Sequence, residues 1–226
     1  SSPWVLPYPV PRGNLAGASA FGVSQAHGSF SALPGVKDEL ERLFPGEDEI
    51  GILDGEFRLD GQFTRASLEA ALASRPPVLH IASHFAMQPG DDTNSFLLLG
   101  DGAQLRLSDI AGSRRLRFDG VELMTLSACS TAMASGGTGV EVEGLGVLAQ
   151  KRNAKAVLAT RWNVADDGTA AFMAEFYDAM VADGMTKAEA MQAAQASMIS
   201  SGNEDTERDY SHPYYWAPYV LMGSWR

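Results

Sequence analysis

The sequence predicts an α/β fold in which helices flank a mostly parallel central sheet. Segments rich in Val, Ile and Leu alternate with segments of helical periodicity along most of the 226 residues. A Gly-Asp-Gly turn between two short apolar runs predicts a β-hairpin inserted into this alternation. The composition does not change after a proline-rich start. We therefore expect an extended arm over residues 1–17 and one domain over residues 18–226.

Three strands and two helices are expected in the first 84 residues. Val36, Leu40 and Leu43 recur at helical spacing after Pro34, which suits the first turn of a helix. The second helix follows Thr64 and ends before a Pro-Pro pair, because proline cannot continue a helix. The next run is apolar throughout, which indicates a strand buried on both faces. The strands are predicted at residues 18–24, 49–53 and 78–84.

The remaining elements are a hairpin, three strands and three helices. The hairpin strands, 95–99 and 104–107, flank the Gly-Asp-Gly turn. Two further apolar runs indicate buried strands. Two amphipathic helices are predicted after them, and a glycine follows the end of each. The predicted strands are 121–128, 156–164 and 218–223, and the predicted helices are 141–152, 169–181 and 187–199.

The charge balance and the single cysteine exclude several classes of protein. Seventeen Lys and Arg residues stand against 28 Asp and Glu residues, giving a net charge of −11, which argues against nucleic acid as the main partner. Cys129 is alone, so no intrachain disulfide forms. No apolar stretch reaches 18 residues and the start is not of signal-peptide type, so we expect no membrane span and a cytoplasmic location. The chain begins without Met, and we interpret it as part of a longer protein.

Two predicted strands end in reactive side chains. The run 78–84 ends in His84, and the run 121–128 is followed by Cys129. If the two strands are parallel neighbours, both side chains leave the same edge of the sheet, where α/β proteins bind ligands. An imidazole beside a thiol can take its proton or hold the thiolate, which makes an activated nucleophile. The glycine-rich loop at 135–139 would leave this site open to a peptide-sized substrate.

Several motifs in the right order resemble those of CHAT domains, caspase-like modules related to separases and often found beside TPR repeats in bacteria. These are LPG (33–35), VLHIASH (78–84), LSACST (126–131), GVEVEGL (139–145), ATRWNVAD (159–166), AFMAEFY (171–177) and HPYYWA (212–217). The resemblance implies a three-layer sandwich with a caspase-like sheet and a cysteine endopeptidase with a His-Cys dyad. His84 matches the family's catalytic histidine and Cys129 its nucleophile. The implied partners are a protein or peptide substrate and an upstream sensor or TPR-type domain.

The resemblance also bears on how substrate is held. The backbone N–H groups of Phe85 and Cys129 would stabilise the oxyanion. Family members commonly have Gly at the position of Phe85, whose ring could narrow the cleft or alter the turn. Asp166 or Asp167 would form an acidic pocket for Arg or Lys before the cut, by resemblance to separases. We expect Trp162 to line the substrate groove, although it could instead fill the core.

Other interpretations of the same residues stay open. His27 is a rival base, and His80 is expected in the core although it could support the site. Asp91 and Asp92 form a solvated turn, an acidic subsite or an ion site, and Asp166 could instead cap the next helix. Phe85 favours a second hypothesis, a catalytically inactive module that binds proteins. A nucleotide-binding flavodoxin-like domain is a third, but no P-loop is present, and we expect no metal and no cofactor.

Overall fold

The computed structural model describes residues 15–44, 51–86, 94–127, 140–162, 164–201 and 209–226. Two β-sheets form in this part of the chain. The main sheet has six strands in the spatial order β2-β1-β3-β7-β8-β9, and a smaller sheet has the order β4-β5-β6. Every pairing in the main sheet is parallel except that of β8 with β9. The predicted mostly parallel α/β sheet is confirmed.

The strands of the main sheet lie close to their expected positions, with one exception. They are β1 (Ala18–Gly22), β2 (Gly55–Leu59), β3 (Val78–Ala82), β7 (Leu123–Ser127), β8 (Ala156–Thr160) and β9 (Tyr219–Gly223). The strand predicted at 49–53 is wrong in its described part, because residues 51–54 form no strand and β2 begins at Gly55. A β-carbon on Gly55 would lie 2.0 Å from the carbonyl oxygen of Ala18, so the pairing of β2 with β1 requires glycine there.

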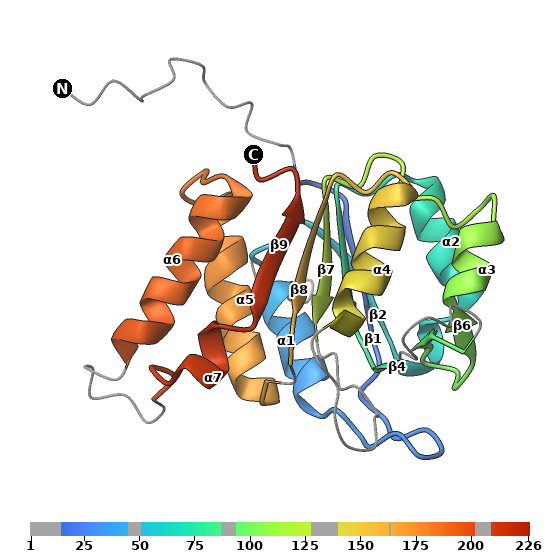
Figure 1. Ribbon diagram of the computed structural model, residues 1–226, viewed down its shortest axis with the longest axis horizontal. Coiled ribbons are helices and arrows are strands. Elements are labelled where there is room, and N and C mark those ends of the chain that lie inside the picture. The colour runs from blue at the N-terminus through green and yellow to red at the C-terminus, as the bar shows by residue number, and fades with distance from the viewer. Residues whose placement is uncertain (1–14, 45–50, 87–93, 128–139, 163, 202–208) are drawn as a thin grey trace.

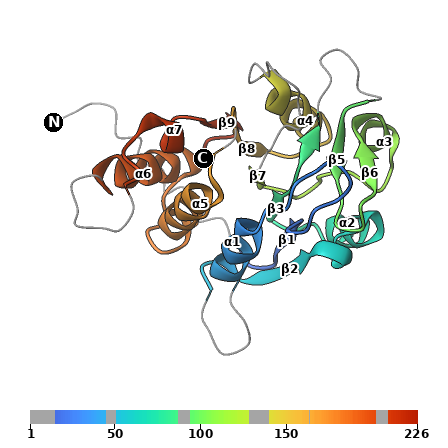
Figure 2. The same ribbon diagram turned by 90° about the horizontal axis from the view of Figure 1, so that it is seen from below.

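Helices cover both faces of the main sheet and make the three layers that the resemblance implied (Figures 1 and 2). On one face lie α1 (Gly35–Leu43), α5 (Asp166–Val181) and α6 (Lys187–Ser200), and on the other lie α2 (Arg65–Ala73), α3 (Leu107–Gly112) and α4 (Val140–Lys151). A short helix, α7 (Pro213–Trp216), precedes β9. The sequence did not predict α3 or α7, and Leu107, expected at the end of the hairpin, begins α3.

The inserted hairpin forms as predicted and joins a small antiparallel sheet. Its strands are β5 (Phe96–Leu98) and β6 (Gln104–Arg106). The third strand of this sheet, β4 (Phe85–Ala86), follows β3 after two connecting residues and pairs with β5. Apolar residues of the hairpin, α2, α3 and α4 form one continuous core against the sheet. A second core lies on the opposite face under α1, α5 and α6. The alternation of β3 serves both cores, since Leu79 and Ile81 face the first and Val78 and Ala82 the second.

Candidate active site

The carboxyl edge of the main sheet brings the predicted site segments to one end of the molecule. β3 pairs with β7 in parallel, in a register that ends with Ala82 opposite Ser127. β8 pairs with β7 on its other side, also in parallel. Parallel strands end at the same edge, where open α/β sheets bind ligands. The expectation that the strands before His84 and Cys129 are parallel neighbours is confirmed.

His84 follows β3 and is buried, with 1% of its surface exposed. Its Nε2 atom lies 2.8 Å from the carbonyl oxygen of Ser31, and the ring of Phe30 packs against the imidazole at a centroid distance of 5.2 Å. A carbonyl oxygen only accepts hydrogen bonds, so Nε2 carries a hydrogen in this contact. In the neutral ring Nδ1 is then the nitrogen with a lone pair. Nδ1 is therefore the atom of the neutral ring that can accept a proton.

The backbone that carries His84 is held by both sheets. The N–H group of Leu98 in β5 donates to the carbonyl oxygen of His84 at 2.9 Å. The hydroxyl of the buried Ser83 donates to the carbonyl oxygen of Leu98 at 2.7 Å, and the Ser83 N–H group donates to the carbonyl oxygen of Ser127 at 3.3 Å. His84 is thus fixed relative to the hairpin and to the end of β7.

The ring of Phe85 lies in the core. It is 1% exposed and belongs to the apolar cluster beneath the hairpin, with Leu97 opposite it in β5. The expectation that a ring at this position could narrow the cleft is therefore not met, because the side chain points into the packed interior. The backbone of Phe85 continues from His84 directly into β4.

Residues 128–139 lie outside the described residues, and they include Cys129 and the glycine-rich loop. The described stretch that contains β7 ends at Ser127, two residues before Cys129 in the sequence. The His-Cys dyad and the N–H group of Cys129 as an oxyanion donor therefore stay predictions. Asp91 and Asp92 also lie outside the described residues.

Trp162 follows β8 at the same edge of the sheet as His84. Its side chain is 42% exposed, and its Nε1–H group donates to the carbonyl oxygen of Tyr214 at 3.1 Å. The alternative in which Trp162 fills the core is wrong, because a core side chain is shielded from water and this one is not. The hydrogen bond to Tyr214 fixes the indole at the surface beside α7.

The acidic pair after β8 begins helix α5. The helix starts at Asp166, and Ala165 occupies the N-cap position, so the alternative in which Asp166 caps the helix is wrong. Asp167 is exposed. One of its carboxylate oxygens accepts a hydrogen bond from the N–H group of Gly168 at 2.9 Å. The other oxygen accepts a hydrogen bond from the hydroxyl of Tyr210 at 3.4 Å. Asp167 therefore presents a negative charge at the carboxyl edge of the sheet.

A cavity of about 380 Å³ lies between the turn at residues 27–30 and the hairpin, and Phe30, which contacts His84, is part of its wall. His27 lines this cavity too, and a β-carbon on Gly102 of the hairpin turn would lie 3.1 Å from its Nδ1 atom. His27, the rival candidate base, therefore lies in the wall of the cavity next to His84, whereas His84 is the histidine that follows β3.

A buried polar network under α1 and α5 supports the same edge of the sheet. Nε2 of His80 lies 3.0 Å from Oε1 of Glu39, and the hydroxyl of Ser127 donates to Oε2 of Glu39 at 2.8 Å. The hydroxyl of Tyr177 lies 3.2 Å from Nδ1 of His80 and 2.6 Å from the hydroxyl of Thr125. All five side chains are buried. Burial, opposed by the Thr125 hydrogen bond, raises the pKa of Tyr177 above its ordinary range, so the phenol is neutral.

The network was only partly foreseen. His80 was expected in the core and is buried there, but Glu39 was missed. The signal lay in helix α1, where Glu39 falls on the buried stripe made by Val36, Leu40 and Leu43. A charged residue on the apolar face of a helix needs buried polar partners, and His80 and Ser127 provide them for Glu39.

The described part of the chain contains neither a candidate metal centre nor a candidate membrane span. No three His, Cys, Asp or Glu side chains among the described residues gather as a group that could hold a metal ion. None of the described helices has the length and apolar character to cross a membrane.

Comparisons with known proteins identify relatives of the fold. The family model of the CHAT domain matches residues 10–224, and no curated protein sequence matches the chain. A solved structure described as a protease aligns with a TM-score of 0.53 at 13% identity, covering 95% of this chain and 49% of its own. The Arg-specific cysteine proteinase gingipain R aligns with a TM-score of 0.49 at 10% identity, covering 92% and 46%. The chain thus spans about half the length of these two structures.

Proposed function

Because this chain belongs to the CHAT domain family, we propose that it is a cysteine endopeptidase in which Cys129 is the nucleophile and His84 its base. The observation that carries the proposal is the parallel pairing of β3 with β7. Because of this pairing, the segment that leads to His84 and the segment that leads to Cys129 leave the sheet at the same edge. The Nε2 contact with the carbonyl oxygen of Ser31 supports Nδ1 of His84 as the basic atom.

In the proposed reaction His84 takes the proton of the Cys129 thiol, and the sulfur attacks the carbonyl carbon of a peptide bond. The backbone N–H groups of Phe85 and Cys129 stabilise the negative oxygen of the tetrahedral intermediate. The imidazolium of His84 then gives its proton to the leaving amine, and the C–N bond breaks. A water molecule, deprotonated by His84, hydrolyses the thioester and restores the thiol.

We infer that the preferred residue before the cut is Arg or Lys. Asp167 is exposed at the edge of the sheet that carries His84, where a carboxylate can meet a basic side chain. Asp166 is its neighbour in the first turn of α5, and the exposed Trp162 can form the wall of the groove. The substrate would then be a protein with an accessible basic site. An upstream TPR-type sensor domain and a cytoplasmic location remain part of the proposal.

The decisive experiment for the dyad compares hydrolysis of a fluorogenic peptide library by the wild-type chain and by Cys129→Ala and His84→Ala. Cys129→Ala should abolish cleavage, and His84→Ala should lower the rate by about 10²–10⁴-fold. His27→Ala is the matched control, since it removes a histidine from the adjoining turn and should leave most of the rate. Cleavage that persists in Cys129→Ala would refute the peptidase.

The substrate preference is tested separately with peptides that differ only in the residue before the cut. We expect Arg or Lys to be preferred, and we expect the preference to fall when both Asp166 and Asp167 are changed to Asn. Preference for an acidic residue, or an unchanged preference in the double variant, would rule out this pocket while leaving the dyad intact.

The rival hypothesis of an inactive protein-binding module was based on Phe85. Its ring is buried in the core, and this supports the peptidase. An electrophilic peptide probe separates the two hypotheses, since it labels an activated thiol at neutral pH and leaves an inert one unmodified.

A further inference from the structure

A second depression lies at the opposite end of the sheet from His84. Its volume is about 530 Å³, within the range of small-molecule sites. It lies between the end of α2 and the segment that leads into β7, so it is at the amino ends of β3 and β7. The proposed peptidase makes no use of this end of the molecule.

The lining of this depression is basic although the chain is acidic. Four arginines line it, Arg75, Arg114, Arg115 and Arg117, against two carboxylates. The formal charge of the lining is therefore +2, whereas the whole chain carries −11. Such a local reversal of sign attracts anions. All four cations are arginines, whose planar guanidinium groups bind oxyanions with two parallel hydrogen bonds.

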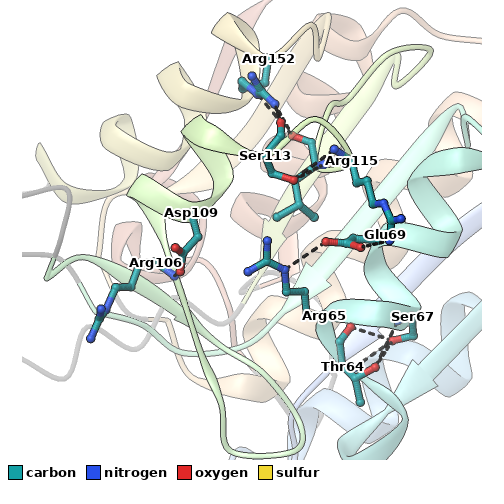
Figure 3. A network of polar contacts seen from close by, with 10 residues as sticks. Thr64, Arg65, Ser67, Glu69, Arg106, Asp109, Ser113, Arg115 and Arg152 are labelled. Carbon is teal, nitrogen blue, oxygen red and sulfur yellow. Dashed lines mark hydrogen bonds and ion pairs between the residues drawn. The ribbon is translucent and has the colours of Figure 1, made fainter.

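The two carboxylates engage only some of these arginines. Glu69 is shared between Arg65, at 3.0 Å, and Arg115, at 3.5 Å, as Figure 3 shows. Arg117 lies 2.8 Å from Asp119. The Arg117 hydrogen bond, supported by one from Asn153 and by the charge of Arg75, lowers the pKa of Asp119 to about 2.

Two guanidinium groups remain for a ligand. Arg75 and Arg114 are both exposed, and neither forms an ion pair or a side-chain hydrogen bond with any other residue that the structure describes. They approach the depression from different elements, since Arg75 follows the end of α2 and Arg114 lies between α3 and β7. An anion between them would therefore bridge the two walls.

The segment that carries three of the arginines is held in place by Arg152 from α4. The Arg152 guanidinium donates to the carbonyl oxygen of Ser113 (Figure 3). It also donates to the carbonyl oxygen of Leu116. The hydroxyl of Ser113 accepts from the N–H groups of Arg115 and Leu116, each at 3.1 Å. The backbone of the basic wall is therefore ordered before any ligand arrives, which lowers the entropic cost of binding.

We propose that this depression binds a small molecule bearing phosphate groups, with Arg75 and Arg114 as the primary phosphate ligands. A phosphate monoester carries about −1.5 to −2 charges at pH 7, so it competes with Glu69 and Asp119 better than a single carboxylate does. The alanine-rich face of α2 offers an apolar surface to the rest of the ligand. The site is independent of the proposed dyad.

The experiment is calorimetric titration of the whole chain with pyrophosphate, with ATP and with citrate, at low ionic strength. Pyrophosphate and ATP should bind, and citrate should bind at least tenfold more weakly. In the double variant Arg75→Gln, Arg114→Gln we expect at least tenfold weaker binding of pyrophosphate. The control Arg42→Gln, Arg161→Gln removes the same charge from two exposed arginines elsewhere and should bind as the wild type does.

A third variant tests the site in the opposite direction. Glu69→Gln releases Arg65 and Arg115 from a carboxylate, so pyrophosphate should bind several-fold more tightly. Thermal melts by circular dichroism establish that each variant is folded. The proposal is overturned if neither phosphate ligand binds, if citrate binds as tightly as pyrophosphate, or if the control pair loses as much affinity as the pocket pair.

Discussion

Nε2 of His80 and Oε1 of Glu39 lie 3.0 Å apart in the interior, where the two side chains are 0% and 2% exposed. Neither atom has a hydrogen-bond partner elsewhere among the described residues, so each is the other's polar contact. The pair joins helix α1 to the middle of strand β3. Through its second oxygen Glu39 also holds Ser127, the last residue of β7.

Removing Glu39 should therefore destabilise the protein strongly. We expect Glu39→Ala to lower the free energy of unfolding by about 3–5 kcal/mol, because it leaves His80 and Ser127 buried without their partner. Glu39→Gln keeps the shape and one acceptor oxygen, so its loss should be about 1–3 kcal/mol. Urea denaturation measures both. Glu41→Ala, an exposed change on the same helix, is the control and should stay within about 0.5 kcal/mol of the wild type.

The Tyr177 hydroxyl is expected to be energetically coupled to Thr125. Tyr177→Phe and Thr125→Val each leave a buried polar group without its partner, and each should cost about 1–3 kcal/mol of stability. The double variant removes both groups, so its loss should be smaller than the sum by about 0.5–3 kcal/mol. A double-mutant cycle by chemical denaturation gives this difference, and strict additivity would show that the 2.6 Å contact carries no energy.

Phe85→Gly introduces the residue expected at this position from the resemblance to CHAT domains, and it should nevertheless damage this protein. The ring is fully buried among the hairpin and sheet residues, so its removal leaves a cavity and should cost about 3–5 kcal/mol. Phe85→Leu keeps most of the volume and should cost less. Thermal denaturation ranks the three proteins. Equal stability of the glycine variant and the wild type would mean that the ring does not fill the core.

Ser83→Ala should affect both stability and the proposed activity. It removes the hydroxyl that donates to Leu98 and so loosens the hairpin against His84, at a cost of about 1–3 kcal/mol. Peptide hydrolysis should slow, with the larger effect on kcat. Ser31→Ala is the matched control, because His84 contacts the backbone carbonyl of Ser31 and the change leaves that acceptor in place.

Asp119 should titrate far below an ordinary aspartate. Its pKa of about 2 is set first by Arg117, so Arg117→Gln should raise it toward the ordinary value of about 3.9. A depressed pKa means that this carboxylate stabilises the fold above its unfolded-state pKa and loses that contribution as the pH falls through about 2. Carbon-detected NMR titration follows the group directly. Arg106→Gln is the control, and an unchanged Asp119 pKa in Arg117→Gln would contradict the assignment.

The fold was predictable where a segment is buried on both faces or ends at proline. β3, β7 and β8 are apolar runs, and the end of α2 follows from the Pro76-Pro77 pair. β2 was misplaced because it is an edge strand, half-exposed and interrupted by Glu56 and Arg58, so it has no apolar run. Its defining residue is a glycine whose need arises only from contact with β1.

The positions of the candidate site residues along the chain were predictable, but the contacts that hold them were not. The position of His84 after a buried strand follows from the local pattern, but its tautomer depends on the carbonyl of Ser31, 53 residues away. The basic depression was not foreseen for the same reason. Arg75 and Arg114 are 39 positions apart in the chain, and only the pairing of β3 with β7 brings them to one end of the sheet.

The buried network also constrains the order in which the protein can mature. Its contacts join residues separated by 88, 97 and 52 positions, and Tyr177 is the last of them to leave the ribosome. Until α5 is synthesised, Nδ1 of His80 and the hydroxyl of Thr125 must remain with water, which opposes closure of α1 over the sheet. The sheet edge that carries His84 should therefore be completed only after Tyr177 has been synthesised.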